Sequence, residues 1–242
     1  QLEENGISAE NVEFHNSGLT AVIKHFTAEA GLRNFERYIG SLCRKVAMQL
    51  AQGKNEKVQI IPETVEKFLG SFLFNDEDRK PNHEIGISTG LAWTAFGGQI
   101  LYIEATKMPG KGFTLTGQLG DVMKESAQTA IGHIKSNADK YCIDHSEFEK
   151  NEIHVHLPAG ATPKDGPSAG ITLATAIISL LTDCPVNKEV AMTGEITLTG
   201  KVLPIGGLKE KALAAMRMDI TTIVIPWNNR KDLQDIPEEY RE

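Results

Sequence analysis

Ser168 is the first residue whose surroundings suggest chemistry, because it follows the turn-rich segment TPKDGP and precedes an apolar run over residues 171–181. The apolar run predicts a buried helix. Serine is favoured at helix N-termini, where its side-chain cap contributes about 1 kcal/mol. The same hydroxyl becomes a nucleophile when a neighbouring base removes its proton. The local sequence therefore leaves two interpretations open, a helix cap and a nucleophile.

Two histidines are the usual first candidates for the base. His154 and His156 alternate with apolar residues in EIHVHLP, so we expect both to project from the solvent side of a half-buried strand. Such a pair is also able to hold a metal ion, but no Cys, Asp or His at ligand spacing completes a site. We therefore predict neither a catalytic role nor a metal site for this pair.

Two lysines are the other candidates. Lys209 and Lys211 lie in GGLKEKALAAM, near the start of a predicted helix that opens on two glycines. Burial among small apolar side chains and the positive end of a helix both favour a neutral amine. A useful base at pH 7 needs a pKa about two to three pH units below the ordinary lysine value of about 10.4. Apolar residues lie at helical spacing from each lysine, so this pattern does not choose between them.

Two further polar residues have ordinary interpretations. Asp165, in PKDGP, is typical of a turn before glycine, and Thr193, in AMTGE, of a strand. A small-Ser-small turn ahead of a helix also binds phosphate through backbone N–H groups, which makes a phosphate-binding transferase a competing function. A complete P-loop is absent, since neither MPGKGF nor LTGKVL has the required spacing. None of these signals is specific by itself.

The composition excludes several classes of protein. The chain has 242 residues and a net charge of −7, with no block of basic residues, which disfavours nucleic-acid binding. Its three cysteines are widely spaced, which favours a reducing compartment over a disulfide framework. Residues 171–181 are too few to span a bilayer, and the N-terminal residues lack a signal-peptide pattern. These features predict a soluble intracellular protein.

The chain reads as two regions. Residues 1–70 carry helical patterns, one from Ser17 toward Gly31, one capped by Asn34 and ending before Gly53, and one before Gly70, with a short strand in KVQIIP. Residues 71–84 are charged and predict a connection between domains. Residues 85–242 mix strands and helices without regular βαβ repetition, which predicts an α+β fold. Gly97-Gly98 is expected to form the turn of a hairpin.

Together these segments resemble the proteolytic domain of the Lon family of ATP-dependent serine proteases. The resemblance rests on PKDGPSAG and on MTGEITLTGKVLPIGGLKEKALAA, and runs from GLAWTAFGG to TIVIP. It implies that residues 85–242 form a mixed α/β domain of the ribosomal S5 domain 2-like type. The family usually continues with another strand and helix, so we expect the C-terminal end of this domain to be truncated.

The resemblance also assigns roles to single residues. It implies that Ser168 is the nucleophile and Lys211, not Lys209, the general base. Thr193 is expected to orient the lysine, and Asp165 to lie beside this Ser-Lys dyad and affect whether the site is open. No metal is expected at the site.

The first region resembles the small α-helical lid subdomain of AAA+ ATPases. EAGLRNFER matches the sensor-2 stretch of the lid, which implies that Arg33 contacts bound nucleotide in the intact protein. The Walker A and Walker B core is missing from the chain. We therefore expect no cofactor in this fragment, and ATP with Mg²⁺ in the intact protein.

The resemblance implies a serine endopeptidase that degrades unfolded or misfolded polypeptides in protein quality control and the stress response. It further implies self-association into a hexameric ring and a cytoplasmic location, with the mitochondrial matrix as the alternative compartment. No membrane or nucleic-acid partner is expected. Two other functions stay open on the residues alone, the phosphate-binding transferase and a non-enzymatic assembly module in which the dyad never aligns.

Overall fold

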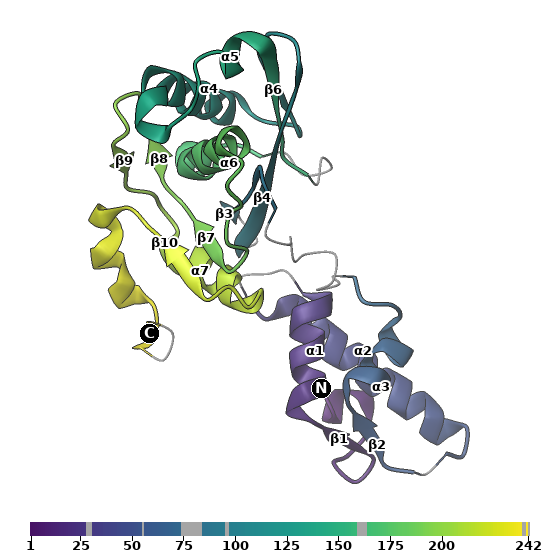
Figure 1. Ribbon diagram of the computed structural model, residues 1–242. Coiled ribbons are helices and arrows are strands. Elements are labelled where there is room, and N and C mark those ends of the chain that lie inside the picture. Colours follow the sequence, from purple (N-terminus) through teal and green to yellow (C-terminus); the bar gives the residue numbers. More distant parts are fainter. Residues whose placement is uncertain are drawn as a thin grey trace. The chain divides into compact units, whose positions relative to one another are not determined.

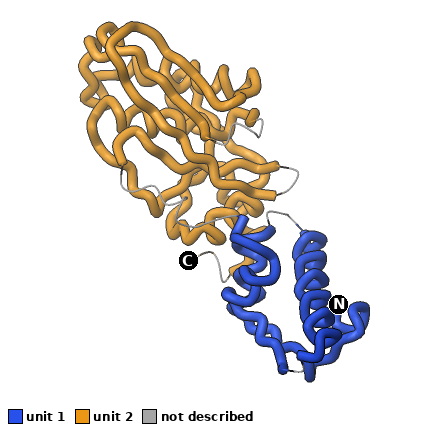
Figure 2. The backbone as a smooth tube through the Cα atoms, turned by 90° about the vertical axis from the view of Figure 1, so that its right-hand side faces the viewer, with its two compact units in different colours: residues 1–79 blue, residues 80–242 orange. Residues whose placement is uncertain are grey.

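The computed structural model describes residues 1–27, 31–54, 56–73, 84–94, 97–158, 164–238 and 241. The chain forms two compact units, Gln1–Arg79 and Lys80–Glu242 (Figure 2). Most of the predicted connection, residues 74–83 of the segment 71–84, lies outside the described residues. Within the described ranges, no helix is both long enough and apolar enough to cross a membrane.

In its described residues, the first unit packs three α-helices on a small parallel strand pair and begins with a 3₁₀ helix, Glu3–Asn5. Its core consists of apolar side chains at helical spacing, because each helix directs one apolar face toward the interior. The fully buried members include Val22, Leu42, Val46, Ile60 and Val65. The elements are β1 (Val12–Phe14), α1 (Asn16–Phe26), α2 (Arg33–Ala51), β2 (Val58–Ile60) and α3 (Pro62–Leu69).

Two details of this unit differ from the sequence prediction. Asn34 does not cap the second helix, because α2 already begins at Arg33 and its N-cap is Leu32. The Asn34 amide oxygen instead accepts a hydrogen bond from the Arg37 guanidinium, one turn along the helix. The strand β1 was not predicted, because three residues are too few to show alternation.

The second unit is built on a six-stranded mixed sheet with the strand order β10-β7-β3-β4-β6-β5 (Figure 1). Strands β3, β4 and β6 pair antiparallel, whereas β5, β7 and β10 join parallel to their neighbours. The strands are β3 (Ile87–Thr94), β4 (Gly97–Pro109), β5 (Gly112–Thr116), β6 (Asn151–His156), β7 (Val190–Met192) and β10 (Thr222–Val224). A separate antiparallel pair consists of β8 (Glu195–Ile196) and β9 (Val202–Leu203).

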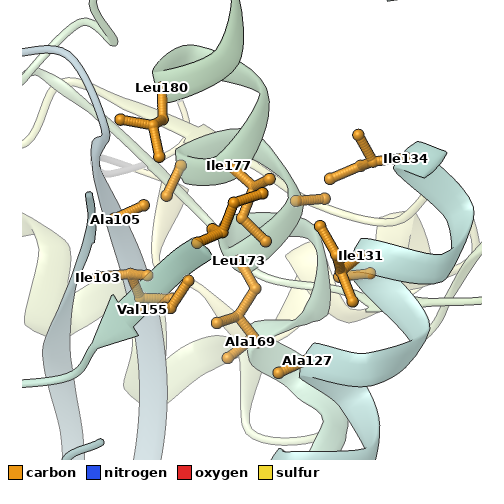
Figure 3. Packing of buried hydrophobic residues seen from close by; sticks show 14 of the residues in the cluster. Ile103, Ala105, Ala127, Ile131, Ile134, Val155, Ala169, Leu173, Ile177 and Leu180 are labelled. Carbon is orange, nitrogen blue, oxygen red and sulfur yellow. The ribbon is translucent and has the colours of Figure 1, made fainter. Parts of the chain in front are cut away.

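Helices cover both faces of this sheet. The predicted apolar helix is α6 (Gly170–Thr182), and it lies between the strands and α4 (Asp121–Ser136). Figure 3 shows Leu173 and Ile177 of α6 between Ile131 of α4 and the strand residues Ile103 and Val155. Such a helix is covered on opposite sides, which explains why almost its whole circumference is apolar. Two short helical elements follow α4 in the chain, the 3₁₀ helix Ala138–Tyr141 and α5 (Glu147–Lys150).

The opposite face of β3 and β4 carries α7 (Leu208–Arg217), the helix that contains both candidate lysines. Leu91 and Ile100 are cross-strand neighbours, and they pack with Ala215 of α7. Leu101 faces the α6 side instead, as the alternation of side chains along a strand requires. The sheet therefore places α6 and α7 on opposite faces.

The glycine pair at 97–98 does not form the hairpin turn that we predicted. The β3–β4 hairpin exists, but Gly97 and Gly98 are the first residues of β4, paired with Thr94 and Trp93. Residues 95 and 96, between the strands, lie outside the described residues. A Cβ atom at Gly98 would overlap the backbone carbonyl of Glu210. Glycine at this position allows α7 to approach the sheet closely.

Replacing Gly98 by alanine should therefore push α7 away from β4. We expect the free energy of unfolding to fall by about 1–3 kcal/mol, the usual effect of overpacking. Urea unfolding of the variant measures this loss. Gly31→Ala is the matched control, because a Cβ atom there meets no atom within 4 Å. Equal stability of Gly98→Ala and the parent chain would contradict the close approach of α7 to β4 at this position.

Candidate active site

Ser168 lies in a one-turn 3₁₀ helix, Pro167–Ala169, directly before α6. The N-cap of α6 is Ala169, and in the described part of the chain no side chain caps either helix. The Ser168 carbonyl accepts hydrogen bonds from Gly194 N at 2.8 Å and from Thr193 Oγ1 at 3.3 Å. The interpretation of Ser168 as a helix cap is therefore wrong, and its backbone, not its hydroxyl, anchors the turn.

Lys211 lies one turn into α7, and it is among the largest fully buried side chains of the molecule, with 2% of its surface exposed. Its Nζ donates a hydrogen bond of 3.0 Å to Thr193 Oγ1. No ion pair to Lys211 Nζ occurs among the described residues. Burial without a carboxylate partner lowers the pKa of Lys211 from 10.5 to about 8, because desolvation disfavours the ammonium form.

Burial separates the two lysines that the sequence pattern left equivalent. Lys209 is exposed, whereas Lys211 faces the interior of the unit. A helix with a 3.6-residue period turns residues two positions apart to different sides, so one lysine reaches the interior while the other reaches solvent.

Thr193 follows β7 and is 1% exposed. Its hydroxyl accepts the hydrogen bond from Lys211 Nζ and donates its own proton to the Ser168 carbonyl. A single hydroxyl thus links the lysine to the turn that carries the serine. The Thr193 backbone is itself held, because its N–H donates to Val224 O on the neighbouring strand β10.

Ser168 and Lys211 line the same cavity, which has a volume of about 300 Å³. Its walls are largely apolar and come from β3, β4, α4 and the segment before α7, including Leu91, Trp93, Leu101, Met123 and Ile205. Glu195 and Asp165 also reach it. The sequence patterns singled out Asp165 but assigned none of the five apolar residues to a site, because those five come from four separate segments and share no spacing.

Asp165 lines the cavity, but its carboxylate is engaged elsewhere. Its Oδ1 accepts hydrogen bonds from Met123 N at 3.0 Å and from Gly166 N at 2.9 Å. Met123 is the third residue of α4, so Asp165 serves as an N-terminal cap of that helix. A Cβ atom at Gly120, the backbone N-cap of α4, would overlap the Asp165 carboxylate, so glycine there leaves room for this cap.

The other predicted residues are not among those that line this cavity. Arg33 is the exposed first residue of α2 in the other unit. His154 and His156 are half-buried on β6, where both rings hydrogen-bond Thr116 Oγ1, at 2.9 and 2.7 Å. Among the residues that the structure describes, no group of three or more His, Cys, Asp or Glu side chains has metal-binding geometry.

Comparison with known proteins identifies the family. Residues 59–242 match the family model of the Lon protease (S16) C-terminal proteolytic domain, and residues 3–59 match that of the Lon protease AAA+ ATPase lid domain. The chain is 54% identical over 239 residues to the Lon protease of Trichlorobacter lovleyi and 56% identical over 239 residues to that of Geobacter metallireducens. Each match covers 98% of this chain but 29% of the relative. The chain therefore belongs to the Lon protease family.

Proposed function

We propose that this chain carries a serine peptidase site in which Ser168 is the nucleophile and Lys211 the general base. The observation that carries the proposal is the burial of Lys211 in the cavity that Ser168 lines, with its Nζ hydrogen-bonded to Thr193. A buried amine with a pKa of about 8 is able to accept a proton near neutral pH. The S16 family of the proteolytic domain supports a peptidase as the class of enzyme.

The proposed reaction begins when neutral Lys211 takes the proton of Ser168 Oγ as that oxygen attacks a peptide carbonyl. The protonated lysine then gives its proton to the leaving amine as the C–N bond breaks. Water, activated by the same lysine, hydrolyses the acyl-enzyme and frees Ser168.

Backbone N–H groups beside Ser168 are proposed to stabilise the oxyanion. Pro167 has no N–H, while those of Gly170 and Ile171 donate to Pro167 O and Gly194 O. The N–H groups of Ser168 and Ala169 are therefore the nearest candidates.

The cavity walls favour a polypeptide over a phosphate ester as the substrate. Apolar walls such as Leu91, Trp93 and Met123 suit an apolar side chain and offer no charge to a phosphate. A half-buried serine is reached by an extended segment more easily than by a folded surface, so we propose unfolded polypeptides as substrates. The transferase alternative has less support, because a lysine that loses its charge near pH 8 is a weak phosphate ligand.

The roles that extend beyond this chain rest on the family resemblance. The chain spans about 29% of the length of the curated relatives described above. We propose that the intact protein works as a hexameric ring in the cytoplasm, with ATP and Mg²⁺ bound by its ATPase part. Among the described residues we assign only Arg33 to the nucleotide, because an exposed guanidinium suits phosphate oxygens. A strictly monomeric and inactive protein would favour the assembly module instead.

The pH dependence of peptide hydrolysis tests the proposed function. Activity requires neutral Lys211, so the rate should be low in acid and rise with a midpoint at about pH 8. At pH 7 about one lysine in ten is then neutral. Hydrolysis of an unstructured fluorogenic peptide from pH 6 to 10 measures the midpoint.

The histidine variants His154→Gln and His156→Gln are the controls for this profile. Both histidines lie outside the residues that line the cavity, so neither variant should move the midpoint. A midpoint near pH 6.5 that disappears in either variant would falsify the assignment of Lys211 as the base.

The hydroxyl of Thr193 should affect the rate through its bond to Lys211. Thr193→Val removes the hydrogen-bond acceptor of Nζ at nearly constant volume, and we expect kcat to fall by about ten- to hundredfold through misplacement of the amine. Thr193→Ser keeps the hydroxyl and should retain most of the activity. Full activity of Thr193→Val would contradict an orienting role.

A further inference from the structure

A helical segment near the end of the second unit packs against α7. This segment, the 3₁₀ helix Trp227–Asp235, is separated from β10 (Thr222–Val224) by two residues. Leu233 and the following Ile236 pack with Leu208 and Ala212 of α7 in a small separate core. The segment therefore touches the helix that carries Lys211.

One polar residue of this segment is buried. Asn229 is 2% exposed, although the segment around it is largely polar. Its Oδ1 accepts a hydrogen bond of 2.9 Å from Ile205 N, and its Nδ2 donates one of 2.8 Å to Ile205 O. The side-chain amide thus pairs with the backbone of one residue in both directions, as a neighbouring strand would.

Asp232 decides which way the Asn229 amide points. Its Oδ2 accepts a second hydrogen bond from Asn229 Nδ2, at 2.6 Å. A carboxylate and a carbonyl are both acceptors, so only the NH₂ end of the amide is able to satisfy the two together. A flipped amide would set its oxygen against both acceptors. The orientation of Asn229 therefore follows from the chemistry of its partners.

Ile205 lies directly before two glycines, Gly206 and Gly207, which connect it to α7. Pro204, Ile205 and Gly206 line the cavity of Ser168 and Lys211. Gly206 is exposed, and a Cβ atom there would meet nothing within 4 Å. Gly207, with φ +67°, is the N-cap of α7, and its carbonyl accepts the hydrogen bond of Lys211 N. Two successive glycines supply no rigidity of their own.

We propose that Asn229, oriented by Asp232, is a positioning residue for the Ser-Lys site. By clamping Ile205 it fixes one wall of the cavity and the point from which the backbone enters α7. Lys211 lies one helical turn after that point. If the backbone at Ile205 is not held, both the cavity wall and the Lys211 amine are able to move. This inference rests on the proposed peptidase function, but the clamp itself is a separate structural claim.

Hydrogen exchange tests the clamp without reference to catalysis. In the full-length protein, the Ile205 amide should be protected, and Asn229→Ala should abolish most of that protection. Asn137→Ala is the matched control, because Asn137 also donates from its side chain to a backbone carbonyl, that of His133, but at the end of α4. It should leave the Ile205 amide unchanged. Equal protection of Ile205 in the parent and in Asn229→Ala overturns the clamp.

Peptide hydrolysis tests the positioning role. Asn229→Ala should lower kcat by about ten- to hundredfold, as expected for a misplaced catalytic group, with a smaller change in KM. Asn229→Asp removes the donor to Ile205 O and sets two carboxylates together. Adding Asp232→Asn restores the side-chain pair, so the double variant should recover part of the lost kcat. Loss of thermal stability with an unchanged kcat overturns the positioning role.

The two claims fail in different ways. If Ser168→Ala hydrolyses the peptide as fast as the parent, the proposed function fails. The clamp is then tested only by hydrogen exchange of the Ile205 amide. If Ser168→Ala is inactive while Asn229→Ala has the parent kcat, the function stands and the positioning role is wrong.

Discussion

Ser168→Ala should abolish peptide hydrolysis, lowering kcat by roughly a thousandfold or more. Ser168 and Lys211 are the only described cavity residues with a hydroxyl or amine group, and the nearby Thr193 hydroxyl is 1% exposed and already donates its proton to the Ser168 carbonyl. No other hydroxyl of the described cavity wall is therefore available to replace Ser168 Oγ. Hydrolysis of the fluorogenic peptide at pH 9, where Lys211 is mostly neutral, gives the largest difference.

The fold should survive this substitution, which makes the result easy to interpret. The Ser168 hydroxyl caps neither of the adjacent helices, and the carbonyl that holds the turn is present in alanine as well. Ser136→Ala is the control, because its hydroxyl donates to Gly132 O in the last turn of α4, away from the cavity. We expect that control to keep the parent rate. A fully active Ser168→Ala variant would remove Ser168 from the mechanism.

Lys211→Met should have two opposite effects, loss of activity and gain of stability. Methionine fills a similar volume without an amine, so the proposed base is lost and kcat should fall about a thousandfold or more. Burial of the ammonium form at pH 7 destabilises the fold. Lowering the pKa of Lys211 from 10.5 to about 8 corresponds to at most about 3 kcal/mol. We therefore expect the variant to gain part of this amount in its free energy of unfolding.

The gain in stability should depend on pH in a defined direction. Between pH 8 and 10.5 the unfolded chain still binds a proton that the folded chain has released, so the parent gains stability as the pH rises. The advantage of Lys211→Met is therefore complete below pH 8 and disappears above pH 10.5. Urea unfolding at pH 7 and at pH 10 measures the difference.

Lys209→Met is the matched control for Lys211→Met, because Lys209 is exposed on the same helix two residues earlier. It should change neither the activity nor the pH dependence of stability. A Lys211→Met chain that is less stable than the parent at pH 7 would contradict the claim that the buried Lys211 ammonium group destabilises the fold.

The sequence predicted those parts of the fold in which a long periodic pattern coincides with an element. The stripe Phe35, Ile39, Leu42 and Val46 gives α2, and the apolar run at 171–181 gives α6. The sequence did not predict the role of residues at which segments distant in the chain approach each other closely. Gly98 was interpreted as a turn residue, although its role comes from α7, more than a hundred residues later in the chain.

The candidate site, like the fold, was predicted from the sequence only in part. The motifs around Ser168, Thr193 and Lys211 drew attention to these residues, but the helical pattern was unable to separate Lys211 from Lys209. The family resemblance favoured Lys211, and the physical difference between the two lysines, burial, is visible only in the packed structure. Asn229 was not singled out, because it is one of several polar residues in WNNRKD, and its role appears only when Ile205 lies beside it.

The assignment of Lys211 as the base that activates Ser168 is tested most directly by covalent labelling with a fluorophosphonate. Serine Oγ displaces fluoride and forms a P–O bond, and mass spectrometry locates the adduct. We predict that the parent protein is labelled at Ser168 and that Lys211→Met lowers the labelling rate by about a thousandfold or more. Labelling of another residue, or labelling of Ser168 at the same rate in Lys211→Met, would contradict the account.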